Sequence, residues 1–395
     1  MKTICIAGKN SIAVNGLKYI VDNYKDYKIL YLPNPTDSCI DNWQPSFKRY
    51  AVSRNVQEAS LEDLYDIPEL IFISLEFSEI IKPSRFKSKQ LFNIHFSLLP
   101  KYKGMYTSAI PLLNGEKNTG VTLHKIEKGI DTGDIVDQMM FPIDIRDNAR
   151  TIYIKYLEYS FQLFVRNINT VLECSYDLRS QPGVDSSYFS KKAIDYQSFS
   201  IDFVKTAYEI HNQYRAFTFR EYQMPKFKEW QIASTELTEI KSTKKPGTVL
   251  YEDQCKYIIA TIDYDITLYK DYYPLLWKSA ESGNIEEFKQ AFNYIDAIDL
   301  KTKNGWTALM IATYNGNIEI VDYLLKEGSD VSETNYKGTT VLMYAYSYYE
   351  KSGNSSIFKL ILDNGAEPKA KDASGKSLFD YMKERNCLDL LHFVL

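Results

Sequence analysis

The chain has 395 residues, enough for two or three domains, and its 45% hydrophobic and 25% charged residues are typical of soluble globular proteins. Its 47 lysines and arginines against 51 acidic residues give a net charge of −4, which argues against general nucleic-acid binding. No apolar run approaches the roughly 20 residues that cross a bilayer, and the start does not resemble a secretory signal. We therefore expect a cytoplasmic protein without a membrane segment.

The N-terminal part alternates β-branched apolar runs with helical patterns. The ranges predicted as strands are 2–7, 27–32, 70–74, 91–96 and 119–125. The predicted helices are 12–21, 105–113 and 151–174. Ser11 is the expected N-cap of the first helix. Strands that alternate with helices predict a doubly wound α/β sheet.

Turn-rich segments divide the rest of the chain. Residues 180–187 and 241–247 are rich in Ser, Pro, Gly and Lys and are predicted to be linkers. Short strands are expected at 248–251, 257–261 and 266–269. The resulting domains are an α/β domain (1–185), linker helices with a small β subdomain (186–270) and a third domain (271–395).

The third domain contains a repeat of 33 residues. Gly283 and Asn284 recur as Gly316 and Asn317, and the pentapeptide GWTAL at 305–309 recurs as GTTVL at 338–342. A 33-residue period with a turn and paired helices is typical of ankyrin repeats. The Pro-Leu-His of the usual motif is replaced by Ala-Leu-Met and Val-Leu-Met. We expect about three repeats and an all-α domain.

A histidine and an asparagine share one face of a predicted strand. Side chains two residues apart in a strand point to the same side, so Asn93 and His95 lie together, and the intervening apolar residues fill the opposite face. Such a pair suits acyl transfer, in which the histidine handles a proton and the amide donates to an oxyanion. A core histidine whose hydrogen bonds are satisfied by a neighbour is the alternative.

A second polar segment follows the strand predicted at 119–125. Asp131 stands between Gly129 and Gly133, where the absence of side chains lets the backbone approach a ligand closely. Taken alone, this pattern favours an ordinary turn over a metal-binding loop.

Together, the two segments resemble the formyltransferases that use N10-formyltetrahydrofolate. Residues 93–100 read Asn-x-His-x-Ser-Leu-Leu-Pro, and residues 129–134, about 35 positions later, read Gly-x-Asp-x-Gly-Asp. The resemblance covers residues 1 to about 185. It implies a Rossmann-like formyltransferase domain.

Further segments resemble the sugar N-formyltransferases within that group. These are residues 188–192 and 215–225, and residues 245–248 are similar to the start of the family's C-terminal β subdomain. The added ankyrin repeats are similar to bacterial enzymes that act on dTDP-3-amino-3,6-dideoxy-D-glucose. The resemblance therefore implies formyl transfer from N10-formyltetrahydrofolate to the amine of a dTDP-linked amino sugar, for O-antigen or other surface glycan synthesis.

The resemblance also implies roles for individual residues and no metal. His95 would take the amine proton, Asn93 would donate to the oxyanion, and Asp131 would orient the imidazole and help to protonate the departing folate nitrogen. The residues implied for the folate pocket are Phe77, Ile80, Asn93, Ile130 and Asp131. Ordinary core packing is the alternative for Phe77 and Ile80.

Aromatic and basic residues are candidates for binding the nucleotide sugar. Phe219 and Tyr222 can stack on a pyrimidine, and Lys191 and Arg215 can pair with a diphosphate. The full set of predicted substrate-binding residues is Met105, Tyr106, Lys191, Arg215, Phe219 and Tyr222. A solvated charge or a packed ring is the alternative at each position. His124 is expected to be structural.

Three other functions remain open at this point. A methionyl-tRNA enzyme would share the chemistry, although the acidic balance disfavours RNA. A dTDP-4-amino-4,6-dideoxyglucose formyltransferase would differ only in the ring carbon that bears the amine. A degenerate formyltransferase body could instead be a scaffold whose ankyrin repeats bind a protein. The β subdomain is a plausible surface for a homodimer.

Trp306 departs from the ankyrin pattern, because its position on the turn between repeats is usually polar. We expect this tryptophan to bury little of its surface within its own domain. An exposed tryptophan among tyrosines can stack on a base, so Trp306 is a candidate second nucleotide site. A protein partner docked on the same residue is the competing interpretation.

Overall fold

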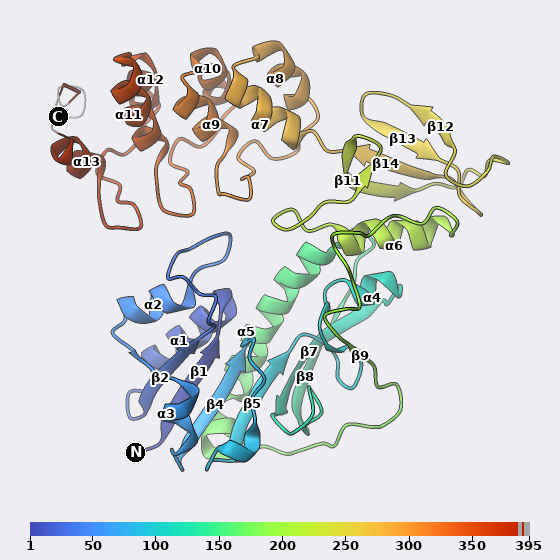
Figure 1. Ribbon diagram of the computed structural model, residues 1–395, viewed down its shortest axis with the longest axis vertical. Coiled ribbons are helices and arrows are strands. Elements are labelled where there is room, and N and C mark those ends of the chain that lie inside the picture. The colour runs from blue at the N-terminus through green and yellow to red at the C-terminus, as the bar shows by residue number, and fades with distance from the viewer. Residues whose placement is uncertain (386–388, 391–395) are drawn as a thin grey trace. The chain divides into compact units, whose positions relative to one another are not determined.

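The structure, a computed structural model, describes residues 1–385 and 389–390 (Figure 1). It divides into two compact units, the first comprising residues 1–40 and 44–269 and the second residues 41–43 and 270–395. The last part of the predicted third domain, at 386–388 and 391–395, lies outside the described residues.

A seven-stranded sheet forms the centre of the first unit, with the order β3-β2-β1-β4-β5-β7-β8. Its strands are β1 (Thr3–Gly8), β2 (Lys28–Pro33), β3 (Gln57–Glu58), β4 (Leu70–Leu75), β5 (Gln90–His95), β7 (Asn118–Lys125) and β8 (Ile135–Pro142). The first five strands in this order are parallel, and β7 runs antiparallel to both β5 and β8. The α/β class predicted from the sequence is confirmed. The sequence analysis did not predict β8, in which only Ile135 and Phe141 are buried.

Helices cover both faces of this sheet. They are α1 (Asn10–Asn23), α2 (Phe47–Ser53), α3 (Leu61–Tyr65), α4 (Ile110–Leu113) and α5 (Ala149–Glu173), with a 3-10 turn at Pro83–Arg85. Leu64 of α3 packs with the buried side chains of one face, and Phe164 and Ile168 of α5 pack on the other. No helix of the described residues is long and apolar enough to cross a membrane.

Two expected helix starts are wrong. The first helix begins at Asn10 with Lys9 in the N-cap position, and the Ser11 amide donates to Gln44 Oε1. A side chain distant in the sequence therefore satisfies one of the free amides in the first turn of the helix. The helix expected over 105–113 begins only at Ile110. Pro111 stands in its first turn, where a missing N–H costs no hydrogen bond.

The first unit ends in a smaller α and β region. A short parallel pair joins β6 (Lys103–Gly104) to β9 (Tyr188–Phe189). Helix α6 (Ala207–Phe217) packs on a five-stranded sheet in the order β10-β11-β14-β13-β12. These strands are β10 (Lys226–Phe227), β11 (Trp230–Leu237), β12 (Val249–Glu252), β13 (Lys256–Ile259) and β14 (Ile266–Lys270). The expected mixed β subdomain is confirmed.

The second unit consists of paired helices, as the repeat predicts. They are α7 (Tyr273–Ser282), α8 (Ile285–Phe292), α9 (Ala308–Asn315), α10 (Ile318–Lys326), α11 (Val341–Ser352), α12 (Ser356–Asp363) and α13 (Leu378–Glu384). The repeated threonines cap the first helix of a pair, because the Thr307 and Thr340 side chains accept from the amides of Met310 and Met343. The spacing of the sequence motif is thus the spacing of helix starts.

Candidate active site

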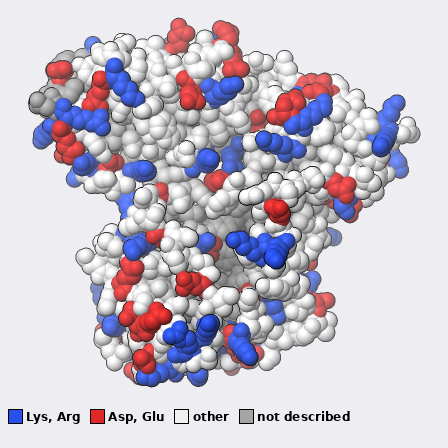
Figure 2. All heavy atoms as spheres, viewed as in Figure 1, with Lys and Arg blue, Asp and Glu red and all other residues white. Residues whose placement is uncertain are grey.

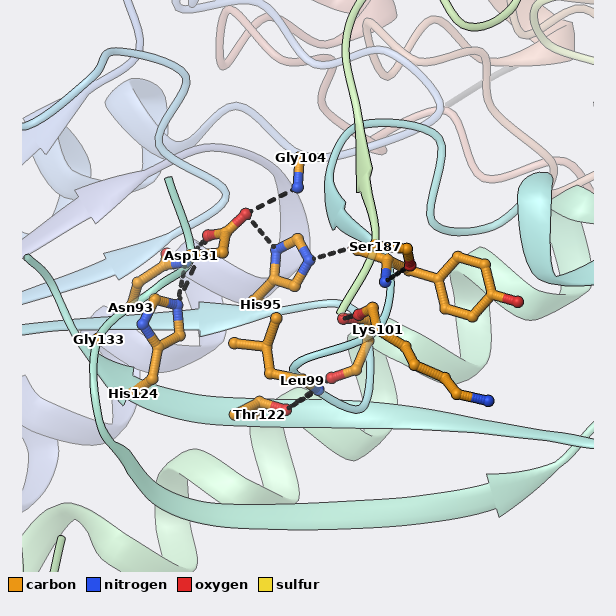
Figure 3. A network of polar contacts seen from close by, with 12 residues as sticks. Asn93, His95, Leu99, Lys101, Gly104, Thr122, His124, Asp131, Gly133 and Ser187 are labelled. Atoms are coloured by element: carbon orange, nitrogen blue, oxygen red, sulfur yellow. Dashed lines mark hydrogen bonds and ion pairs between the residues drawn. The ribbon is translucent and has the colours of Figure 1, made fainter. Parts of the chain in front are cut away.

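The candidate site lies where β5 ends beside β7. His95 is the last residue of β5 and pairs with Thr122, and Asn93 pairs with His124. Asp131 comes from the loop that follows β7. Figure 3 shows these side chains pointing toward one another, with Asp131 between the two histidines. The tertiary fold therefore unites the two segments that the sequence singled out.

The imidazole of His95 is held in one tautomer. Its Nε2 lies 2.8 Å from the carbonyl oxygen of Tyr102, which can only accept, so the hydrogen resides on Nε2. The lone pair of Nδ1 is left free, 3.4 Å from Asp131 Oδ2. Burial lowers the pKa of His95, although the charge of Asp131 opposes this effect. A neutral His95 can therefore take a proton on Nδ1, next to a carboxylate that stabilises the resulting cation.

Asp131 is held as a carboxylate. Burial raises the pKa of its carboxyl, but the two histidines and the Gly104 amide outweigh this effect and lower the pKa overall. The Gly104 amide donates to Oδ2 at 2.9 Å. Only glycine fits there, since Gly104 has a φ of +84° and an added Cβ would lie 2.3 Å from the Phe189 carbonyl oxygen.

His124 orients the amide of Asn93. His124 Nδ1 lies 2.7 Å from the Lys125 carbonyl oxygen and must carry the hydrogen, so Nε2 accepts from Asn93 Nδ2 at 3.1 Å. The second hydrogen of that amide makes a long hydrogen bond, of 3.5 Å, to Asp131 Oδ1. His124 was expected to be structural, and its structural contact is with Asn93, a residue of the site itself. The sequence does not show which strand pairs with β5.

Gln181 is a residue of the site that the sequence interpretation missed. Its Nε2 donates at 2.8 Å to the carbonyl oxygens of both Asp131 and Gly133. These bonds hold Asp131 in a left-handed conformation, with a φ of 54°, which is uncommon for a residue with a side chain. Gln181 lies in a segment predicted to be a linker, and nothing in its local sequence indicates this contact.

We expect Gln181→Glu to lower kcat by about 10- to 100-fold, because small displacements of a reacting group have effects of this size. The substitution would place a carboxylate oxygen against two carbonyl oxygens and displace the Asp131 loop. Steady-state kinetics together with thermal unfolding would test the prediction. Gln197→Glu, at an exposed position, is the matched control. Wild-type kcat in folded Gln181→Glu would exclude a positioning role for Gln181.

Comparisons with known proteins agree with this geometry. The formyl transferase profile matches residues 47–168, and the formyl transferase C-terminal domain profile matches residues 193–270. A solved sugar 3N-formyl transferase, WlaRD, crystallised in the presence of dTDP and 5-N-formyl-THF, is 47% identical. The match covers 68% of this chain and 98% of that one, with a TM-score of 0.65. The chain belongs to the formyltransferase family.

Other relatives of this chain include further formyltransferases. The N-formyltransferase from Helicobacter canadensis, solved with folinic acid and dTDP-3-aminofucose, is 44% identical over 68% of this chain and all of that one, with a TM-score of 0.65. The methionyl-tRNA formyltransferase of Endomicrobium trichonymphae is 34% identical over 43% of this chain. The chain spans 57% of that relative and 28% of the polymyxin resistance protein ArnA of Wigglesworthia glossinidia brevipalpis. The ankyrin profile, with three copies, matches residues 255–372 and confirms the predicted repeats.

A cavity of about 560 Å³ adjoins the network of this formyltransferase. The predicted site residues that line it are Phe77, Ile80, Asn93, His95, Met105, Ile130, Asp131 and Lys191. Ile80 and Ile130 are exposed at its wall, 71% and 42% respectively, which suits a flat heteroaromatic ring such as a pterin. Among the described residues, no group of His, Cys, Asp and Glu side chains is arranged to hold a metal ion.

Four predicted substrate residues, among them Arg215, do not line this cavity. Arg215 is buried, and its guanidinium donates to the carbonyl oxygens of Asp144 and Asp147 and to Asn212 Oδ1. These bonds commit the cation to holding a loop on α6, so it does not meet a diphosphate in the catalytic cavity. Sequence alone cannot distinguish such a buried structural arginine from a ligand-binding one.

The remaining three residues lie in aromatic clusters near the cavity. Phe219 is buried between the rings of Tyr153 and Tyr222, whereas Tyr222 is 67% exposed. The Tyr106 hydroxyl donates to the Lys191 carbonyl oxygen at 2.7 Å, which fixes the segment that carries Lys191. Phe219 and Tyr106 are therefore not among the residues that line the cavity.

Trp306 is more buried than expected. Its ring centroid lies 4.3 Å from that of Tyr344 and 5.4 Å from that of Tyr314. Lys351 Nζ lies 3.7 Å from the Tyr314 ring centroid. The expectation of little burial within its own domain was wrong, because the two tyrosines of α9 and α11 pack against the indole.

Proposed function

We propose that this formyltransferase transfers the formyl group of N10-formyltetrahydrofolate to the amine of a dTDP-linked 3-amino-3,6-dideoxy sugar, most directly dTDP-3-amino-3,6-dideoxy-D-glucose. The observation that carries the proposal is the network of Asn93, His95 and Asp131 in the wall of one cavity, flanked by exposed apolar side chains. The solved relatives with dTDP and a formylated folate support the substrate class.

The geometry supports general-base acyl transfer. The sugar amine attacks the formyl carbon, and His95 Nδ1 takes the proton that the amine loses. Asn93 donates an amide hydrogen to the formyl oxygen as negative charge develops there, in exchange for its long 3.5 Å hydrogen bond to Asp131. Asp131 stabilises the imidazolium, which then gives its proton to the departing folate nitrogen. The Tyr102 carbonyl, and not Asp131, keeps the imidazole in the required tautomer.

A mass-spectrometric assay of nucleotide-linked amino sugars tests the proposal. Purified protein and fresh N10-formyltetrahydrofolate would be offered dTDP-linked 3-amino and 4-amino sugars in parallel with methionyl-tRNA. We expect a formylated 3-amino product. Preferred formylation of a 4-amino sugar would change the assigned substrate. Formylation of methionyl-tRNA alone, or of nothing with folded protein, would overturn the proposal and favour the tRNA enzyme or the scaffold.

The charge distribution favours a small substrate over RNA. On the face shown in Figure 2, lysine and arginine side chains are interspersed with acidic ones and do not form a continuous basic surface. RNA binding generally relies on such a surface. The net charge of −4 also disfavours RNA binding.

The exposed surface of the β subdomain bears on how the protein assembles. We infer a homodimer formed through the β subdomain, which is supported by its exposed apolar side chains Leu237, Ile240, Tyr251, Ile262 and Tyr264. The product would serve cytoplasmic synthesis of a surface glycan such as O-antigen. Light scattering on the purified chain would test the dimer, and a monomeric mass would contradict it.

We propose that Trp306, whose indole is half-buried against Tyr314 and Tyr344, belongs to a second nucleotide site in the ankyrin unit. We expect calorimetry of the full chain with dTDP to show two binding events, and Trp306→Ala to remove one of them, because a stacked base is worth roughly 1–3 kcal/mol. Trp306→Phe keeps a stacking ring and should retain part of the affinity. A single event that Trp306→Ala leaves unchanged would favour a protein partner at this surface.

A further inference from the structure

Glu76 is a carboxylate in the wall of the catalytic cavity to which none of the roles above is assigned. Tyr153 Oη donates to it, at 3.0 Å from Oε1 and 2.9 Å from Oε2, and Asn10 Nδ2 donates to Oε2 at 3.2 Å. Among the described residues, no lysine, arginine or histidine forms an ion pair with it. Two neutral donors therefore hold this carboxylate by hydrogen bonds, and Lys9 acts on it only as a nearby charge without an ion pair.

The backbone holds Glu76 in this place under strain. Its φ is 62°, in the left-handed region that residues with side chains avoid. Its carbonyl oxygen accepts from Asn34 Nδ2, and the Asn34 Oδ1 in turn accepts from the Ser78 amide. Strained conformations held by surrounding hydrogen bonds cluster at functional sites.

Strand register places Glu76 beside the base. Leu75 at the end of β4 pairs with Ile94 of β5, so Glu76 directly follows β4 next to His95, the last residue of β5. Both residues line the same cavity. Neighbouring strands lie about 4.8 Å apart, so one small group in the cavity can be near both side chains.

The proton balance of the proposed reaction calls for a second acceptor. A primary amine is largely an ammonium ion at neutral pH, and an ammonium ion has no lone pair with which to attack. It must lose one proton before the attack and another after it. His95 can take only one, which it passes to the folate nitrogen. One proton must therefore leave by another group.

We propose that Glu76 binds the ammonium group of the amino sugar and accepts its first proton, which frees the amine to attack the formyl carbon. This inference rests on the proposed function. The nitrogen–hydrogen electron pair stays on the amine nitrogen, the proton joins a Glu76 oxygen, and the carboxyl group releases that proton to water after the product leaves. His95 remains neutral and takes the second proton.

The electrostatic environment of Glu76 is consistent with this role. Burial raises its pKa to about 7, although Lys9, Tyr153 and Asn10 favour the ionised form. The charged and titratable groups that act on it are Lys9 before α1 and Tyr153 on α5. A carboxyl group with this pKa is ionised in part of the protein at neutral pH and exchanges its proton readily.

Binding measurements without turnover test the first half of the inference. Calorimetry would compare dTDP-3-amino-3,6-dideoxyglucose with dTDP-6-deoxyglucose, which has a hydroxyl in place of the amine. We expect wild type to prefer the amine, and Glu76→Gln to lose about 10- to 100-fold of that preference, as expected for a hydrogen bond to a charged group. Glu62→Gln, at an exposed position on α3, is the matched control.

The pH dependence of turnover tests the second half. Glu76→Gln should lower kcat/KM most at pH 6–7, with partial recovery at higher pH, because free amine is then already present in solution. Tyr153→Phe removes a donor that favours the carboxylate, so its acid limb should shift to higher pH. This second variant keeps Glu76 and guards against misfolding of the first.

The outcomes separate this inference from the proposed function. A wild type that formylates no dTDP-amino sugar overturns both. An active wild type overturns this inference alone if Glu76→Gln keeps both the preference for the amine and the wild-type pH profile. Loss of the preference together with recovery at high pH supports it.

Discussion

Replacing His95 with asparagine is expected to lower kcat for formyl transfer by about 10²–10⁴-fold, the usual contribution of a general base. Asparagine can still donate to the Tyr102 carbonyl but offers no basic nitrogen at the position of Nδ1. Single-turnover assays with the amino-sugar product read by mass spectrometry would measure the loss. Binding of dTDP should change little, because the imidazole contributes to proton transfer rather than to the nucleotide.

His211→Asn is the matched control for this experiment. His211 is also buried, but its ring nitrogens contact Thr235 Oγ1 and the Ile145 carbonyl oxygen, away from the catalytic cavity. We expect this variant to lose some thermal stability and to keep its kcat. A folded His95→Asn protein with near-wild-type kcat would remove His95 from the mechanism.

Asp131→Asn is expected to lower kcat by about 10²–10⁴-fold with little change in KM. The shape of the side chain is preserved, but the negative charge 3.4 Å from His95 Nδ1 is lost, so the imidazolium is no longer stabilised. Steady-state kinetics would check the split between kcat and KM. Asp177→Asn, at an exposed position beyond α5, is the control. A large rise in KM with normal kcat would instead assign Asp131 to binding.

The same variant makes a prediction about stability. The pKa of Asp131 is lowered in the folded protein, so its carboxylate contributes stability above the unfolded-state pKa of about 4. That contribution is lost as the pH falls through the lowered folded-state pKa. The difference in unfolding free energy between wild type and Asp131→Asn should therefore be largest near neutral pH and should shrink in acid. Chemical unfolding at several pH values would measure it.

Local patterns in the sequence predicted those features that depend on nearby residues. The ankyrin repeats could be predicted because their signals are local. The 33-residue period, the capping threonines and the left-handed glycines such as Gly283 and Gly316 each act within one helix pair. The shared strand face of Asn93 and His95 could be predicted for the same reason, since it depends only on their spacing of two residues. The roles attached to them came from the resemblance to formyltransferases, and the hydrogen-bond network around them is consistent with those roles.

Contacts between distant segments were decided only by the tertiary structure. The pairing of β5 with β7 brings His124 to Asn93, and a segment that looked like a linker brings Gln181 to the Asp131 loop. The sequence suggested that Arg215 binds a diphosphate, whereas in the structure its guanidinium donates to the carbonyl oxygens of Asp144 and Asp147. The position of Glu76 in the cavity wall likewise depends on distant contacts, with Tyr153 and Asn10. Whether a charged side chain has a partner depends on atoms that folding brings from elsewhere in the chain, and the identity of the residue does not reveal them.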